Sequence, residues 1–211
     1  PSRINSKRPI MHFLDSAIAE GSLNEILPIT REKDFSFYTF ARPEPWLASM
    51  TEELAESGCL MLQLGVESGS LRLLKKFCKG IRPEVSLEVM RRASSAGIRT
   101  YIYMLLGLPG ESEEDTADSQ RLLEAAGSSV DFINFSIYNL PENCELTSRA
   151  SEFGIELLDE MIPEGRIRLY RPLLYEDDSP GIGAPESIST RFPEISSVKN
   201  ALRRTPNWFR T

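Results

Sequence analysis

The chain has 211 residues, of which 24 are Lys or Arg, 31 are Asp or Glu and 41% are hydrophobic, and its formal net charge is −7. These proportions are typical of a folded globular protein and exclude wholesale disorder. The acidic balance disfavours phosphate backbones, so nucleic acid is not expected as a partner. No apolar run approaches the roughly 18 residues of a membrane helix and no secretory signal is present, so we expect a cytoplasmic location without a membrane partner.

Strand-like and helix-like segments alternate along the chain. The strand-like runs are rich in β-branched, aromatic or other apolar residues, and they are Ile10–Asp15, Phe35–Arg42, Leu60–Glu67, Arg99–Gly107 and Phe132–Leu140. Helices are predicted between them, several with Pro near the start or Gly just past the end, over Ala17–Leu27, Trp46–Ser57, Leu71–Lys79, Pro83–Ala96 and a segment through Ala126 that opens on the capping box Ser112–Asp115. Pro28 is expected to end the first helix. This alternation predicts parallel strands joined by crossover helices.

After about Ile155 the alternation fades. The stretch Asp177–Pro193 is rich in Pro, Gly and Ser and is predicted to be loop, followed by a short helix near Ser196–Arg204. We therefore divide the chain into a barrel-like domain over residues 1–158 and a loop-rich extension over residues 159–211.

The two faces of the strands differ in polarity. In Leu60–Glu67, one face carries Leu62, Leu64 and Val66, and the other carries Gln63, Gly65 and Glu67. A flat parallel sheet covered by helices on both sides would be apolar on both faces. The fold class predicted is therefore α/β, with a curved, barrel-type parallel sheet that has helices outside and a polar cavity within, rather than a doubly wound sheet.

Polar residues and glycines recur at the carboxyl ends of the strands, where barrels of this kind hold their active sites. Glu67 is expected to point into the cavity with Arg42 as its partner, while Ser68 or Ser70 also suits a helix N-cap. Three carboxylates follow Gly107–Glu111, and they would repel a phosphate at the start of the next helix. That loop is either a Gly/Pro turn with a good cap or a place where backbone approaches a planar ligand.

Cysteine and histidine usage narrows the chemistry further. Cys59, Cys78 and Cys144 have no metal-ligand spacing and are expected to be buried structural residues. His12 is the one histidine, so a serine triad or a Cys–His dyad has no support. An aldolase- or isomerase-type barrel would need a Lys or His base at a strand end, and neither residue appears there.

Several long motifs, in this order, resemble the radical S-adenosylmethionine (SAM) superfamily. The segment Gly58–Ser70, which reads GCLMLQLGVESGS, resembles the fourth strand of those enzymes, and the segment from Ala96 through Leu106-Gly107-Leu108-Pro109-Gly110-Glu111 resembles the fifth. Residues 11–16 and 40–43 resemble the second and third strands. Within the superfamily, these segments are most similar to those of the branch that often carries an upstream cobalamin-binding domain, near the methylthiotransferase and Elongator-type enzymes.

The resemblance implies a partial (β/α)6 barrel in which a [4Fe–4S] cluster binds SAM for radical chemistry, with a reductant protein as partner. Cobalamin, the substrate and the reaction type stay open. The resemblance places the cofactor against Arg42, Glu67, Ser68, Leu106, Gly107, Leu108, Tyr138 and Asn139. It makes the cavity residues Asp15, Tyr38, Gln63, Tyr103, Asn134 and Ser136 the substrate-facing set, while the catalytic residues stay unknown.

Two departures from the family pattern matter. The C-x-x-x-C-x-x-C cluster loop and the strand before it are absent, and Pro141-Glu142-Asn143-Cys144 stands where the family often has Pro-x-Gly-Thr. Because the chain also starts at Pro1 without Met, we expect a piece of a longer radical SAM enzyme that cannot assemble the cluster by itself. The alternatives are an inert degenerate domain and a non-catalytic barrel-like module that binds a ligand or partner.

Overall fold

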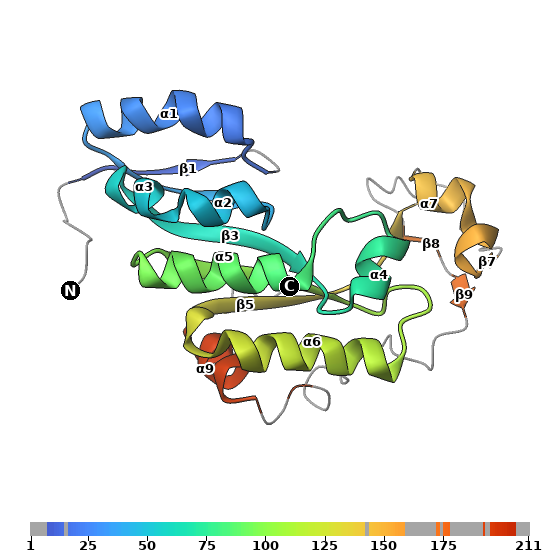
Figure 1. Cartoon of the computed structure of the whole chain (residues 1–211). Coiled ribbons are helices and arrows are strands. Elements are labelled where there is room, and N and C mark those ends of the chain that lie inside the picture. Colours follow the sequence, from blue (N-terminus) through green and yellow to red (C-terminus); the bar gives the residue numbers. More distant parts are fainter. Residues whose placement is uncertain are drawn as a thin grey trace, which may run out of the picture.

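The computed structural model describes residues 8–14, 17–141, 144–158, 172–173, 175–177, 192 and 195–205. Its centre is one sheet of five parallel strands that follow one another in chain order (Figure 1). The strands are β1 Ile10–Phe13, β2 Ser36–Ala41, β3 Cys59–Glu67, β4 Arg99–Leu106 and β5 Phe132–Ile137. An unreversed strand order is that of a barrel wall, whereas a doubly wound sheet reverses its order at a switch point. The predicted α/β barrel-type fold is confirmed, as an open sheet.

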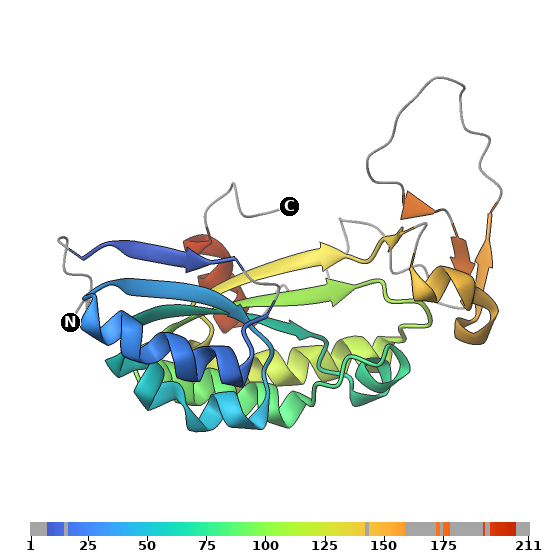
Figure 2. The same cartoon turned by 90° about the horizontal axis from the view of Figure 1, so that it is seen from above.

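The helices that connect the strands lie on one side of the sheet (Figure 2). They are α1 Glu20–Glu32, α2 Pro45–Ser49, α3 Thr51–Glu56, α4 Leu71–Lys76, α5 Pro83–Ser95 and α6 Glu113–Ala126. Beneath them Leu62, Leu64 and Val66 are fully buried in the main hydrophobic core. The predicted division of the strands into an apolar outer face and a polar inner face is therefore correct.

Two helix predictions are wrong. Helix α1 does not end at Pro28, because Leu23, Leu27 and Thr30 bury one face on both sides of it, and this burial outweighs the one backbone hydrogen bond that proline removes. The segment predicted as one helix over Trp46–Ser57 is two helices that meet at Met50. At that junction the Thr51 hydroxyl donates to the Ala48 carbonyl, so a side chain satisfies a carbonyl at the helix end.

The chain after β5 adds a small peripheral part. The predicted fifth strand stops at Ile137, and β6 Leu140–Pro141 pairs antiparallel with β8 Pro172–Leu173. The strands β7 Ile155–Leu157 and β9 Tyr175–Asp177 form a second antiparallel pair. Short helical turns lie beside these pairs, at α7 Glu145–Ser148 and η2 Ala150–Phe153, whereas the turn η1 Gly127–Ser129 connects α6 to β5. Most of the predicted loop Asp177–Pro193 lies outside the described residues.

Helix α9, Ser196–Arg204, forms where it was predicted and packs on β5 beside α6. Its Val198 and Ala201 are buried in the main core. The Thr205 hydroxyl bonds the backbone N–H and carbonyl of Ile133, and the Arg204 guanidinium donates to the carbonyls of Val130 and Asp131. Helix α9 thus shares the core of the sheet, and the division at residue 158 stays a prediction.

The turn between β3 and α4 is pressed against helix α6. A side-chain Cβ on Gly69 would lie 2.4 Å from the Asp118 carbonyl oxygen and 2.5 Å from the Cα of Ser119. The Gly69 N–H also donates to the Ser119 hydroxyl at 2.9 Å. Only glycine allows the two backbones to approach this closely.

We predict that Gly69→Ala lowers the free energy of unfolding by about 2–3 kcal/mol, because the clash is with backbone atoms that cannot move aside cheaply. Urea unfolding followed by circular dichroism measures the change. Gly21→Ala is the control, because a Cβ there meets nothing within 4 Å in helix α1, and alanine should stabilise that helix by about 0.5–1 kcal/mol. An unchanged midpoint for Gly69→Ala would contradict the close approach.

Candidate functional site at the carboxyl ends of the strands

Strand β3 ends in a bulge that turns Glu67 back over the sheet. The register with β4 shifts between Gly65 and Glu67, and Glu67 has φ +67°. A non-glycine residue in this left-handed region costs about 1 kcal/mol. A Cβ on Gly65 would lie 2.9 Å from the Oε1 atom of Glu67, so the carboxylate occupies the space above Gly65. Glu67 therefore lies on the polar inner face, as the sequence predicts.

The carboxylate of Glu67 is mostly buried, with 21% of the side chain exposed, and its ion-pair partner is Lys79 at 4.0 Å. Burial raises the pKa of Glu67, and the positive charges of Lys79 and Arg42 oppose that rise. Its charged form is thus incompletely compensated within the described residues. A cationic ligand group beside this carboxylate would favour its ionised form.

The predicted pairing of Arg42 with Glu67 is wrong. The Arg42 guanidinium donates to the backbone carbonyl of Lys79, and its Nε atom lies 3.7 Å from Glu44. Arg42 follows β2 and reaches the segment after α4 rather than the carboxylate on β3. It therefore acts on Glu67 only through its longer-range charge and positions Lys79, which is the actual partner.

Ser68 and Ser70 belong to a clamp between the β3–α4 turn and helix α6. The Ser68 hydroxyl accepts from the Ser70 N–H at 3.0 Å and lies 3.3 Å from the Ser119 hydroxyl. Ser70 is the N-cap of α4 and donates to Asp115 at 2.5 Å. Both serines are buried, so the hydroxyl of Ser68 serves this clamp, and its role toward a cofactor stays a prediction.

Asp115 is the acceptor that the clamp shares. Its carboxylate accepts from Arg72 and from the N–H and hydroxyl of Ser112, which completes the predicted capping box of α6. Burial opposes the charge, but the hydrogen bonds from Arg72, Ser112 and Ser70 hold the pKa of Asp115 well below its usual range. The clamp is therefore charged and rigid at neutral pH.

In the loop after β4, the backbone N–H groups already bind a carboxylate from the same loop. The Glu111 carboxylate accepts from the N–H groups of Gly107 at 2.6 Å and Leu108 at 3.2 Å, and Thr116 donates to its other oxygen at 3.3 Å. The donors that a phosphate would need are thus already used. The side chains of Leu106 and Leu108 are each 1% exposed, so this loop can offer a ligand little more than its backbone.

A pocket of about 340 Å³ opens at this edge of the sheet. Its walls come from the end of α4, the loop after β4, the segment after β5, and the turns α7 and η2. Three of the predicted cofactor residues line it together, and Lys79 is also in its wall; the lining residues are Phe77, Cys78, Lys79, Leu108, Tyr138, Asn139, Cys144, Glu145, Leu146, Arg149 and Phe153. The Phe77 ring stacks on Phe153 at 5.6 Å, which gives the pocket a partly aromatic lining.

Sequence reasoning did not select Lys79, Phe77 or Phe153 for this site. The Lys76 ammonium joins two walls of the pocket, because it donates to the carbonyls of Pro109 at 2.9 Å and Phe153 at 3.1 Å. Neither Lys79 nor the aromatic residues carry a local sequence signal, because α4 ends at Lys76 and Lys79 lies three residues beyond it.

The inner face of the sheet gathers most of the predicted cavity residues. The Gln63 side chain lies 3.0 Å from the Nε2 atom of His12 and accepts from the Tyr103 hydroxyl at 2.8 Å. Asn134 donates to the Ser136 hydroxyl at 2.9 Å on β5. Tyr38 stacks on His12 at 4.2 Å between ring centroids. Asp15 lies outside the described residues.

The cysteines do not form a metal site. Cys59 is buried, as expected, and burial raises the pKa of its thiol to about 12. The expectation is wrong for Cys78, which is exposed, because it follows α4 with φ +50° at the surface. Cys144 is half-buried. Among the described residues, no group of three His, Cys, Asp or Glu side chains is arranged to hold a metal ion.

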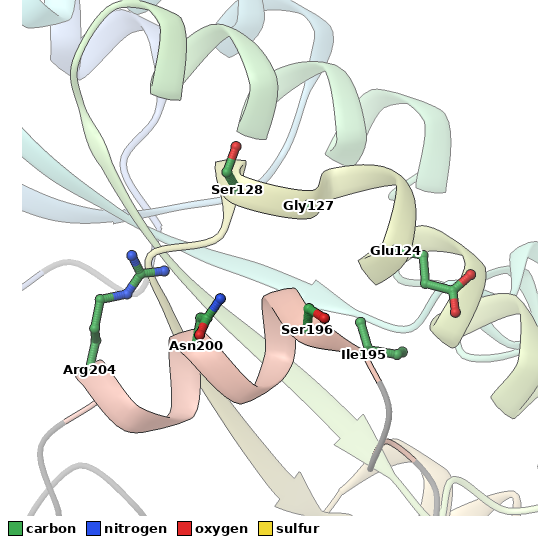
Figure 3. A pocket seen from close by; sticks show the side chains of 7 residues that line it. All are labelled: Glu124, Gly127, Ser128, Ile195, Ser196, Asn200 and Arg204. Atoms are coloured by element: carbon green, nitrogen blue, oxygen red, sulfur yellow. The ribbon is translucent and has the colours of Figure 1, made fainter.

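A second pocket, of about 440 Å³, lies away from the carboxyl ends of the strands, between the end of α6, η1 and helix α9 (Figure 3). Its Arg204 is already bonded to backbone carbonyls. None of the residues predicted for the site lines it; the lining residues are Glu124, Gly127, Ser128, Ile195, Ser196, Asn200 and Arg204. We therefore place the candidate site at the carboxyl edge and inner face of the sheet.

Over the part of the chain that the structure describes, no helix is both long and apolar enough to cross a membrane.

Comparison with known sequences gives the chain a family. Residues 17–123, which are 107 of the 211 residues, match the Radical SAM superfamily. A tRNA-2-methylthio-N(6)-dimethylallyladenosine synthase from Shewanella sp. (strain W3-18-1) is 27% identical over 155 residues, which cover 69% of the chain and 31% of the relative. An uncharacterised methyltransferase from Pyrococcus horikoshii is 26% identical over 104 residues, which cover 49% of the chain and 22% of the relative. The chain thus spans less than a third of the length of these relatives.

Solved structures share the fold. The radical S-adenosylmethionine methyltransferase TsrM from Kitasatospora setae, with cobalamin and a [4Fe–4S] cluster bound, superposes with a TM-score of 0.65 at 17% identity, over 87% of the chain and 43% of TsrM. Coproporphyrinogen III oxidase from Escherichia coli superposes with a TM-score of 0.51 at 15% identity, over 64% of the chain and 32% of that enzyme.

The burial of the Glu67 carboxylate should make thermal stability depend on pH. Because the folded state raises the pKa of Glu67 above its ordinary value of 4.5, its ionised side chain disfavours folding, and the contribution of Glu67 to stability should fall as pH rises above about 4.5. Glu67→Gln should therefore unfold at a higher temperature than wild type at about pH 7, and the advantage should vanish at about pH 4. Thermal unfolding at both pH values measures this, with the exposed Glu84→Gln as the matched control. A lower melting temperature for Glu67→Gln at neutral pH would contradict it.

Proposed function

The chain belongs to the radical SAM superfamily, and on that premise we propose that its sheet is the part of an enzyme core that binds SAM at the carboxyl ends of β3, β4 and β5. SAM and a [4Fe–4S] cluster are the cofactors that this superfamily implies. The main support is the mostly buried carboxylate of Glu67 on the inner face, whose ion-pair partner Lys79, at 4.0 Å, lines the edge pocket.

The chemistry of the edge suits the parts of SAM. The Glu67 carboxylate would bind a cationic group, the ammonium or the sulfonium, and Lys79 lies 4.0 Å away to meet the carboxylate of the ligand. The partly aromatic pocket with Leu108, Tyr138 and Asn139 would hold the adenine ring beside it. These residues bind and orient the cofactor, and Arg42 holds Lys79 in place through its backbone carbonyl.

The described residues do not fit the [4Fe–4S] cluster. A cluster needs several thiolates, whereas the Cys59 thiol is buried with a pKa raised to about 12 and no three-residue metal group exists among the described side chains. We propose that the cluster ligands come from polypeptide that pairs with the edge of β1 on which no described strand lies. On and beside β1, the exposed fractions of Ile10, Met11 and Leu14 are 51%, 46% and 79%, and such an apolar strand edge is usually covered.

Radical catalysis by the whole protein, in the cytoplasm and with a reductant protein as partner, is part of this proposal. Cobalamin is bound in TsrM, and we include cobalamin binding by the whole protein in the proposal. The absence of cluster ligands among the described residues favours one alternative, a ligand-binding module that holds SAM or a similar molecule without catalysis.

Isothermal titration with SAM tests the binding site on the chain itself. Glu67→Gln should weaken binding about tenfold, because a charge-assisted contact of about 1.4 kcal/mol or more is lost. Gly65→Ala should also weaken binding, because its Cβ would lie 2.9 Å from the Oε1 atom of Glu67 and displace that carboxylate.

The control for both variants is Glu84→Gln, an exposed carboxylate on helix α5, which should bind as wild type does. Failure of wild type to bind SAM at millimolar concentration, or equal affinity in Glu67→Gln and wild type, would refute the assignment of this site.

A further inference from the structure

Aromatic side chains form adjoining rows across the inner face of the sheet. Parallel register pairs His12 with Tyr38, and pairs Phe40 with Gln63 and Gln63 with Tyr101. Tyr101 stacks on Tyr103 at 4.7 Å between centroids, and Phe40 lies 6.0 Å from Tyr103. The inner face therefore has an aromatic floor, made of His12, Tyr38, Phe40, Tyr101 and Tyr103.

Part of this floor presents ring edges rather than ring faces. His12 and Tyr38 are directly paired neighbours on strands that lie about 4.8 Å apart. Their ring centroids are 4.2 Å apart with planes inclined by 16°, so the two rings fill the inter-strand spacing face to face and stand upright on the sheet. The edge of an aromatic ring is its positively polarised part, and it attracts the π-face of another ring.

Two polar members of the floor are joined by Gln63. Gln63 links His12 to Tyr103, since it accepts from the Tyr103 hydroxyl and its other end lies 3.0 Å from the imidazole. Burial lowers the pKa of His12, so the imidazole is neutral at physiological pH. On β5, Asn134 and Ser136 add an amide and a hydroxyl at the side of the floor.

Charge is confined to the two ends of this face. At the amino end, Arg99 is paired with Asp131 at 2.6 Å, and at the carboxyl end Glu67 is paired with Lys79. Between them the described inner-face side chains of β1–β5 are neutral; they include His12, Tyr38, Phe40, Met61, Gln63, Tyr101, Tyr103, Leu105, Phe132, Asn134 and Ser136. A charged ligand group placed there would lose its hydration without a counter-ion.

We propose that this aromatic floor binds an uncharged, electron-rich heteroaromatic ring of the substrate, which lies with its π-face over the upright ring edges and its polar atoms toward Asn134 and Ser136. This inference rests on the proposed function, and it adds the class of substrate for a core that binds SAM at the adjoining edge.

The lone histidine gives a direct readout on the full chain. Its imidazole signals in a proton–carbon NMR spectrum need no further assignment, and a ring stacked over the floor should shift them through its ring current. Indole is the probe, with cyclohexanol as a neutral saturated control and benzoate as a charged aromatic control. We expect saturable shifts of the His12 signals with indole, and at most a fifth of that effect with either control.

Two variants at one position separate stacking from hydrogen bonding. Tyr103→Leu should weaken indole binding at least fivefold, whereas Tyr103→Phe, which keeps the ring, should stay within twofold of wild type. If Tyr103→Leu does not fold, Ser136→Leu replaces it, because the added bulk covers the floor from β5 without removing a ring. Thermal unfolding checks each variant.

Unshifted His12 signals with indole, equal shifts with cyclohexanol, or wild-type affinity in a folded Tyr103→Leu would overturn the proposal. Titration with SAM in the same samples keeps the two claims apart. If SAM binds and indole does not, only the ring-binding inference fails. If indole binds and SAM does not, the proposed function fails, and the floor remains a ring-binding face.

Discussion

The carboxylate of Asp115 is the interaction on which the candidate site depends. It stands at the start of α6 and accepts from Arg72 and Ser70 of the β3–α4 connection, so it locks the end of one strand to the start of the helix that follows the next. Gly69 makes that approach close enough. Because the turn directly after Glu67 is fixed in this way, the left-handed backbone of Glu67 can persist and its carboxylate stays on the inner face.

Successive side chains of each strand point to opposite faces of the sheet, so the two faces have different roles. Outward side chains such as Leu62 and Leu64 supply the core beneath the helices, and inward ones such as Gln63 are left for a ligand. The bulge at the end of β3 breaks this alternation once, and Gly65 leaves room for the carboxylate that the break turns inward. The neutral aromatic floor and the charged edge thus lie on the same face, at different depths along the strands.

Much of the fold could be predicted from the sequence because periodicity, caps and Gly or Pro signals are local. The capping box at Ser112, helix α9 and the polarity of both strand faces are of this kind. The errors concern features set by distant contacts. Pro28 is tolerated because α1 packs on the sheet on both sides of it, and Arg42 finds a backbone carbonyl rather than Glu67. The role of Lys79 depends on the turn of α4, which no local pattern specifies.

Glu67 is a mostly buried carboxylate, and we propose that it binds the cationic part of SAM. The most direct measurement is the pKa of Glu67 from its carboxyl carbon-13 shift, assigned with Glu67→Gln, in the free protein and with saturating SAM. We expect a pKa above the ordinary 4.5 in the free protein and a clear fall when SAM binds. An ordinary pKa in the free protein, or one that saturating SAM leaves unchanged, would contradict it.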